Sequence, residues 1–340
     1  MRIIWLPLEP FECRYTQQWY EIFPRAFQEL GVDYITVEGQ ALTSKIEIGS
    51  VLDAFSTSHW KMSQLANLVK LMRDEDVKSS DVILSADLWH PGIEALQYIA
   101  CQGGVRPRIT GILHAGTWDS FDFTVRTGMR PWGHQLEEAW FEIYDLVFVG
   151  SLYHKNLILK SHRVNPNKIV VTGLPFYPDE LPRTGAPKDK NLVVFPHRLD
   201  PEKCPEEFDG LADLLSPQFP EVEWVKTAQV CQTKEQYYEL LEKALISVSF
   251  SQQETFGIAM LESTALGCIP FVPDRLAYPE YYPKGLRYGN FSELVQLVSM
   301  VLGGGWTQFS GAARETAIKH CECLAGSIAR MLNTLRSLKW

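Results

Sequence analysis

Two glutamates spaced eight residues apart, Glu254 and Glu262, form the strongest candidate site in the sequence. They flank the start of a predicted helix, Phe256–Leu266, which follows an apolar strand, Ile246–Phe250, and has Gly257 in its first turn. A helix N-terminus exposes unpaired N–H groups and a partial positive charge, so it can hold a diphosphate. Glu254 would accept hydrogen bonds from sugar hydroxyls, and Glu262 from both hydroxyls of a ribose. An acid at this position also stabilises a helix that binds nothing, but the strand–loop–helix context favours a binding site.

Two cations follow the predicted strand Leu192–Pro196 in the segment FPHRLDPEK. Arg198 can bind phosphate oxygens with two parallel hydrogen bonds, and Lys203 adds a point charge. Alone, these residues are typical of an exposed surface. Together with the glutamate pair they predict a site for an anionic ligand.

Histidines and an aspartate follow two further predicted strands, Arg108–Leu113 and Val82–Leu84. His114 comes directly after the first of these strands and Asp87 and His90 follow the second. Because the carboxyl ends of parallel strands share one edge of a sheet, these side chains are candidates for contact with a ligand. Asp87 and His90 would contact a second substrate, called the acceptor below, or would orient the His114 ring. A structural loop histidine and a helix cap by Asp87 are the alternatives.

A loop rich in acids and aromatics, Glu9–Trp19, follows the first predicted strand. Aromatic rings beside an arginine can stack a nucleic-acid base, and a carboxylate can accept from the edge of that base. The alternative is a structural loop whose rings belong to the core. The residues proposed to bind the acceptor are Glu9, Arg14, Tyr15 and Trp19 in this loop, with Asp87 and His90.

The elements that position these residues alternate between apolar strands and helices, which predicts parallel sheets covered on both faces. A break at 174–189, with four prolines and a glycine, predicts an interdomain linker. We therefore expect an α/β chain with two Rossmann-like domains, 1–173 and 190–305, and a ligand cleft between them. Residues 306–340 are expected to form a C-terminal helix that returns toward the first domain.

Composition narrows the class of protein. The chain has 340 residues, 46% hydrophobic and 21% charged, which fits an ordinary globular protein. It contains no apolar run of the roughly 18 residues that a membrane helix needs, so no membrane contact is expected. Its seven cysteines show no C-x-x-C pair, which favours a reducing, cytoplasmic location and argues against a zinc site.

Charge is distributed unevenly along the chain, whose formal net charge is −9. That value argues against a protein covered in nucleic acid. Residues 101–170, however, carry eight Lys or Arg against six Asp or Glu. This segment is either an ordinary solvated surface or a local contact surface for a polyanion.

The combination of R-x4-K and E-x7-E resembles the retaining GT-B glycosyltransferases of the GT4 type. The segments FPHRLDPEKCPEEF and TFGIAMLE, and GCIPFVPDRLAYPEYYP further on, are similar to the branch that contains queuosine-tRNA mannosyltransferases. The opening, LEPFECRYTQQW, resembles phage-encoded glycosyltransferases of modified DNA bases. If this protein is phage-encoded too, we expect it to act in the cytoplasm of the host cell. The chain departs from the GT4 pattern in lacking a glycine-rich loop after its first strand.

This resemblance implies a role for each matching residue. Arg198 and Lys203 would bind the donor diphosphate, Glu262 the ribose and Glu254 the transferred sugar, while His114 would lie near the reacting sugar. The remaining expected donor contacts are His197, Thr255, Phe256 and Gly257, the last two through their backbone. Such enzymes use no metal and no cofactor besides a nucleotide sugar such as a UDP-sugar or GDP-sugar. The sequence likewise has no D-x-D at a strand end and no clustered histidines.

The sequence therefore predicts a glycosyltransferase, with the acceptor left open. A hydroxymethylated pyrimidine in phage-type DNA is the first candidate, queuosine in tRNA the second, and a small molecule or glycan the third. A nucleotide-sugar binder without catalysis is the alternative from another class. A phosphorylase or epimerase on the same scaffold is a further alternative, but no pyridoxal-phosphate lysine motif or extra carboxylate beside His114 supports either.

Overall fold

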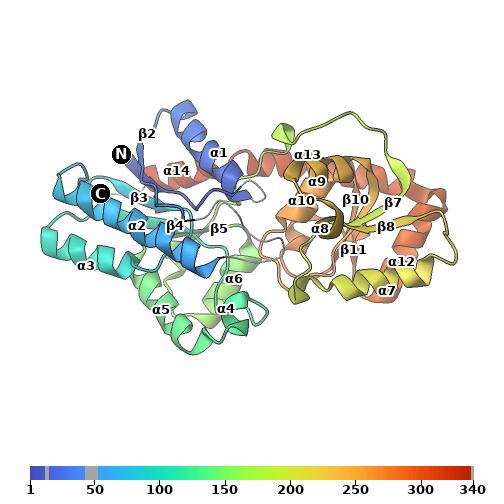
Figure 1. Cartoon of the computed structure of the whole chain (residues 1–340), viewed down its shortest axis with the longest axis horizontal. Helices are drawn as coiled ribbons and strands as arrows, with labels where there is room; N and C mark the ends of the chain where they lie inside the picture. The colour runs from blue at the N-terminus through green and yellow to red at the C-terminus, as the bar shows by residue number, and fades with distance from the viewer. Residues whose placement is uncertain (12–14, 43–52, 338–340) are drawn as a thin grey trace. The chain divides into compact units, whose positions relative to one another are not determined.

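The computed structural model describes residues 1–11, 15–42 and 53–337, and it divides into two compact units (Figure 1). The first unit comprises Met1–Pro175 together with Gly326–Trp340, and the second comprises Phe176–Ala325. Each unit has its own parallel sheet. The predicted class, two parallel-sheet α/β domains, is confirmed.

The first unit is built on six described strands in the order β2-β1-β3-β4-β5-β6. β3 and β5 are buried along their whole length, as expected for central strands of a parallel sheet with helices on both faces. The strands are β1 (Arg2–Leu6), β2 (Asp33–Thr36), β3 (Val82–Ser85), β4 (Arg108–Ile112), β5 (Leu146–Val149) and β6 (Ile169–Val171). The helices are α1 (Tyr15–Glu29), α2 (Ala54–Arg73), α3 (Ile93–Gly103), α4 (Phe123–Arg126), α5 (Arg130–Ile143), α6 (Leu152–Ser161) and α14 (Ser327–Ser337).

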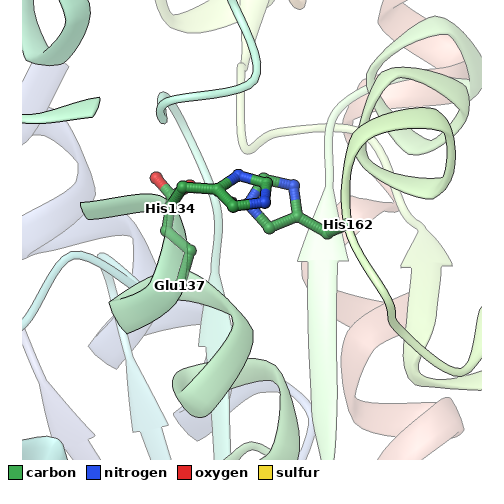
Figure 2. A group of neighbouring side chains, drawn as sticks. All are labelled: His134, Glu137 and His162. Atoms are coloured by element: carbon green, nitrogen blue, oxygen red, sulfur yellow. The ribbon is translucent and has the colours of Figure 1, made fainter. Parts of the chain in front are cut away.

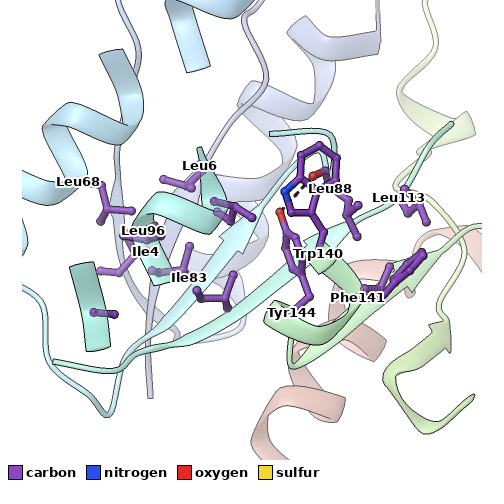
Figure 3. Close-up of a cluster of buried hydrophobic side chains, with 14 of the residues drawn as sticks. Ile4, Leu6, Leu68, Ile83, Leu88, Leu96, Leu113, Trp140, Phe141 and Tyr144 are labelled. Carbon is purple, nitrogen blue, oxygen red and sulfur yellow. Dashed lines mark hydrogen bonds between the residues drawn. The ribbon is translucent and has the colours of Figure 1, made fainter. Parts of the chain in front are cut away.

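The core of this unit joins the sheet to α5 (Figure 3). Trp140 and Tyr144 are fully buried, and each uses its polar atom: the indole N–H donates to Glu94 at 2.9 Å and the phenol donates to the Leu88 carbonyl at 3.3 Å. Gly111 of β4 lets Tyr144 approach the strand, because a Cβ there would lie 2.7 Å from the ring. The loop after β3 is thereby held against α5.

The second unit is built on five described strands in the order β11-β10-β9-β7-β8. The strands are β7 (Asp189–Phe195), β8 (Glu223–Lys226), β9 (Ala244–Val248), β10 (Ile269–Pro273) and β11 (Arg287–Tyr288). The helices are α7 (Pro205–Leu215), α8 (Thr227–Val230), α9 (Lys234–Lys243), α10 (Ile258–Ala265), α11 (Tyr278–Tyr281), α12 (Phe291–Met300) and α13 (Trp306–Leu324). None of the described helices in either unit is both long and apolar enough to cross a membrane.

The C-terminal region differs from the single helix expected over 306–340. The structure contains two helices, α13 and α14, which separate at Ala325 and Gly326. α13 belongs to the second unit and α14 to the first, where the Arg330 guanidinium donates to the Thr172 carbonyl at 2.7 Å. The break coincides with the point where the chain passes from the second unit back to the first.

The proline-rich segment 174–189 packs mainly as part of the second unit. The Glu242 carboxylate of α9 accepts hydrogen bonds from the backbone of Thr184 at 2.7 Å and of Gly185 at 3.0 Å. The division between the units falls between Pro175 and Phe176. The proline-rich segment thus begins at the boundary between the units, and most of it packs on the second unit instead of forming an extended linker.

Candidate active site

Lys203 and Glu254, which are far apart in the sequence, form an ion pair in the second unit. β7 and β9 are neighbours in the sheet, so the loops that follow them meet at its carboxyl edge. The Lys203 ammonium lies 3.1 Å from the Glu254 carboxylate and donates to the Gln253 carbonyl at 2.7 Å. This contact unites two residues that the sequence assigned to separate motifs.

Glu254 also accepts a hydrogen bond from the backbone at the N-terminus of α10. Its second carboxylate oxygen accepts from the Gly257 N–H at 2.9 Å. Gly257 has φ +90°, a conformation that favours glycine, and a Cβ there would lie 3.1 Å from the Tyr278 ring. Because of this left-handed residue, α10 begins at Ile258 and not at Phe256 as predicted. The helix end holds an anionic group of the chain itself, as the helix dipole favours.

Arg198 lies in the same loop as Lys203 but is more exposed. Its side chain is 45% exposed and pairs with Asp200 at 3.0 Å and with Glu202 at 3.6 Å. Only the guanidinium is exposed in these pairs, since the side chains of Asp200 and Glu202 are 11% and 3% exposed. The exposed part of the guanidinium is therefore available to a phosphate.

Glu262 is almost completely buried, at 2% exposure, and accepts three side-chain hydrogen bonds. Oε1 accepts from Lys234 and Tyr238, each at 2.8 Å, and Oε2 accepts from Tyr237 at 3.1 Å. A carboxylate offers about four lone-pair positions. One ribose hydroxyl can bind at Oε2 directly, whereas a second one has to displace one of these donors.

The donors to Glu262 come from one face of α9, and the sequence analysis missed all three. Lys234, Tyr237 and Tyr238 stand at positions i, i+3 and i+4, which lie side by side on a helix. The Lys234 ammonium lies 4.8 Å from the centre of each tyrosine ring. Burial and the charge of Glu262 raise the pKa of Tyr237 well above its usual value, so it remains a proton donor.

The other predicted donor residues occupy different environments. His197 is buried at the end of β7 against Phe195, and burial together with nearby cations lowers its pKa well below the usual value, so the ring is neutral. The Phe256 ring is only 1% exposed and packs on Tyr281 in the core, which leaves its backbone for ligand contact. Thr255 is partly exposed beside it.

His114 lies at the carboxyl edge of the sheet in the first unit, after β4. Its Nε2–H donates to the Ala86 carbonyl at 2.8 Å, and its ring packs near Trp19 and Tyr15 at 5.1 and 5.9 Å between centroids. Burial lowers the pKa of this histidine. The ring is therefore neutral, and the Ala86 carbonyl helps to fix its orientation.

Trp19 is a core residue, which corrects the expectation that a base stacks on it. The indole is 2% exposed, packs on Phe23, and donates its N–H to the Pro175 carbonyl at 3.0 Å. Its ring has no open face for a base. The burial follows from the helical register, since Trp19, Phe23 and Phe27 all point from α1 into the core.

Asp87 and His90 lie in the loop after β3. Asp87 pairs with Lys61 at 2.6 Å and accepts from the Trp89 N–H at 3.1 Å; it does not cap α3, whose N-cap is Gly92. His90 is buried against Gln64, and burial lowers its pKa to about 4. Of the predicted loop residues before α1, Glu9 is buried and Arg14 lies outside the described residues.

A group of two histidines and a glutamate in the first unit corrects the statement that the histidines are not clustered. His134, Glu137 and His162 lie together, and their ligand-type atoms fall within 4.8 Å of one another (Figure 2). The two imidazoles are 4.1 Å apart between centroids and lie at 39°.

Glu137 uses both of its oxygens for internal hydrogen bonds. Oε1 accepts from the Trp89 indole at 2.9 Å and the Thr117 N–H at 2.8 Å, and Oε2 accepts from His162 at 2.9 Å and from the Thr117 hydroxyl. Residues of both candidate loops, after β3 and after β4, thus meet on one buried carboxylate. We interpret this group as the anchor that fixes the two loops.

Comparison with known proteins found no matching family model. The chain is 32% identical to the tRNA-queuosine alpha-mannosyltransferase of Drosophila melanogaster over 95 residues. This match covers 28% of the chain and 23% of that relative, so the chain spans about a quarter of the relative's length.

Solved structures resemble the whole chain. Sucrose-phosphate synthase from Thermosynechococcus elongatus aligns with a TM-score of 0.69 at 12% identity, over 99% of this chain and all of that one. Anabaena HepE, solved with UDP and glucose, aligns with a TM-score of 0.65 at 11% identity, again over 99% of this chain and all of that one. At this identity the likeness shows the fold, which is that of GT-B glycosyltransferases.

Proposed function

We propose that the chain is a retaining, metal-independent glycosyltransferase that moves a sugar from a nucleotide sugar to a modified base in nucleic acid. The observation that carries the proposal is the arrangement of Lys203, Glu254 and Gly257 at the N-terminus of α10, with Glu262 two turns further on. The GT-B neighbours, among them one solved with UDP and glucose, and the partial relative support the same activity.

The donor would bind in the second unit. Arg198 and Lys203 would exchange their carboxylate partners for the diphosphate, and Glu262 would hold the ribose. Glu254, released from Lys203, would accept from hydroxyls of the transferred sugar. Cations and the helix N-terminus would then stabilise the negative charge that grows as the diphosphate leaves.

The reaction forms a bond between the acceptor oxygen and the anomeric carbon as the bond from that carbon to the phosphate oxygen breaks on the same face. The acceptor proton passes to the departing phosphate oxygen. No dedicated protein base is needed for this step, because the departing phosphate oxygen takes the proton. His114 would lie near the reacting sugar, where it would support charge or orient a hydroxyl.

Two modified bases in nucleic acid are candidate acceptors. The opening of the chain favours a hydroxymethylated pyrimidine in DNA, and the partial relative, which is a tRNA-queuosine mannosyltransferase by name, favours queuosine in tRNA. A small alcohol or glycan is the alternative outside nucleic acid.

The test incubates the protein with a panel of nucleotide sugars and with either hydroxymethylated DNA or queuosine-containing tRNA. The nucleic acid is then digested, and each nucleoside is examined for the mass gain of one sugar. Lys203→Ala is the inactive variant, and Glu239→Gln on the exposed face of α9 is the control. Sugar transfer to a small alcohol alone would remove nucleic acid from the proposal, whereas donor binding without any transfer would leave a binding protein.

A further inference from the structure

A buried carboxyl group without a hydrogen-bond partner follows β1. Glu9 is 4% exposed, and neither of its carboxylate oxygens has a partner among the residues that the structure describes. Buried carboxyl groups are normally paired, because removing a charge from water is unfavourable. An unpaired carboxyl group is therefore a candidate contact for a ligand that supplies the missing partner.

The loop that carries Glu9 is held firmly by its neighbours. The Pro7 carbonyl accepts from the Trp60 indole at 3.1 Å and from Gln64 at 3.0 Å, and the Phe11 N–H donates to Thr16 at 3.3 Å. All five of these residues are themselves buried. The isolation of Glu9 is therefore a property of a fixed loop.

Glu9 lies after β1, at the sheet edge to which the sequence analysis assigned the acceptor. β1 pairs with β3, and β3 pairs with β4, all in parallel. Glu9 therefore follows the same sheet edge as Asp87 after β3 and His114 after β4.

A second acid increases the negative character around Glu9. Asp53 caps α2 by accepting from the Ser56 N–H at 3.1 Å, which lowers its pKa and keeps it ionised. Burial raises the pKa of Glu9 and the charge of Asp53 raises it further, while His59, which contacts the Gln40 carbonyl at 2.9 Å, acts in the opposite direction. A ligand that brings a positive charge is favoured by both acids.

We propose that Glu9, assisted by the charge of Asp53, binds a protonated amine carried by the acceptor base. An ammonium group supplies both the charge and the N–H donors that Glu9 lacks, whereas a neutral hydroxyl supplies one donor and no charge. Among the described residues, no third His, Cys, Asp or Glu joins Glu9 in a group suited to a metal ion. The inference rests on the proposed function and selects an amine-bearing base, such as queuosine, over a hydroxymethylated pyrimidine.

The first test is thermal unfolding of the Glu9→Gln variant, which keeps the shape and removes the charge. Because an unpaired buried charge opposes folding, we expect the melting temperature to rise. Glu29→Gln, an exposed acid at the end of α1, is the control with the same change in charge. A clear fall in melting temperature for Glu9→Gln alone would mean that Glu9 has a structural partner, and it would overturn the proposal.

The second test is calorimetric titration with two free nucleosides, queuosine and 5-hydroxymethyldeoxyuridine. We expect Glu9→Gln to weaken binding of the amine-bearing nucleoside by about tenfold or more, the loss typical of one charge-assisted pair. Binding of the neutral nucleoside should be the same in both proteins, and Glu29→Gln should behave as the wild type. Equal affinity of wild type and Glu9→Gln for queuosine would overturn the proposal.

The transfer assay separates this inference from the proposed function. If the wild type glycosylates hydroxymethylated DNA alone and Glu9→Gln retains that activity, the amine subsite is refuted and the glycosyltransferase stands. If no nucleic acid is glycosylated but queuosine binding still depends on Glu9, the proposed function fails and the amine subsite stands.

Discussion

Replacement of Glu262 tests the donor site most directly. Its carboxylate accepts from Lys234, Tyr237 and Tyr238, so Glu262→Ala removes a buried charge that three donors satisfy. Each hydrogen bond from a ribose hydroxyl to a carboxylate contributes about 1.5–3 kcal/mol. Because one hydroxyl has to displace an internal donor, we expect a net loss of roughly 2–4 kcal/mol, or about 30-fold to 1000-fold in donor Kd.

The assay is calorimetric titration of the protein with UDP and GDP, with Glu239→Gln as the control. Glu262→Gln is included because it retains the shape and spares the fold more than alanine does. Breaking a buried ionic contact destabilises a protein by about 3–5 kcal/mol, so the melting temperature of each variant is measured first. A folded Glu262→Ala protein with wild-type affinity for both nucleotides would refute the assignment of the ribose site.

The remaining predictions concern turnover, metal, nucleic acid and pH. Arg198→Ala and Lys203→Ala should lower turnover at saturating donor more than they weaken binding of the bare nucleoside. The reason is that the two cations stabilise negative charge that grows on the diphosphate only as it leaves. Wild-type turnover in both variants would contradict this role. Transfer activity should persist in EDTA; loss that magnesium or manganese restores would show a metal requirement. Binding to nucleic acid should depend weakly on salt, with about 2–4 phosphate contacts at roughly −0.9 each in the log–log slope on duplex DNA. Arg126→Ala and Arg130→Ala should flatten that slope without changing donor affinity, and a slope unaltered by both would place the contact elsewhere. Acidification should destabilise the fold. His90 has a folded pKa of about 4, so the unfolded chain binds the extra proton first, below its ordinary value of 6.5. The stability from neutral His90 is complete above that value and falls as pH drops toward 4; His90→Asn should reduce this dependence in unfolding measured by circular dichroism.

The sequence analysis succeeded where the answer depends on near neighbours. Apolar runs such as Val82–Leu84 predict buried strands, and the Glu254–Glu262 spacing around Gly257 predicts a strand, a loop and a helix. These features depend on backbone preferences and periodicity within a few residues. The alternation of such elements was enough to predict two parallel-sheet domains.

Side-chain environments within that frame were harder to predict. Trp19 looked available for a base because its loop is polar, but the register of α1 directs it into the core. The long C-terminal helix looked continuous because its residues favour helix throughout. Its division into α13 and α14 reflects the two cores on which it packs.

By itself, the sequence determined the chemical types at the candidate donor site and the order of elements that present them. Only the tertiary structure decided that Lys203 pairs with Glu254, that α9 supplies the donors to Glu262, and that Glu9 has no hydrogen-bond partner among the described residues. The physical reason is that each of these contacts depends on which distant strands lie side by side and on which side chains fill the space between them. Local periodicity carries neither piece of information.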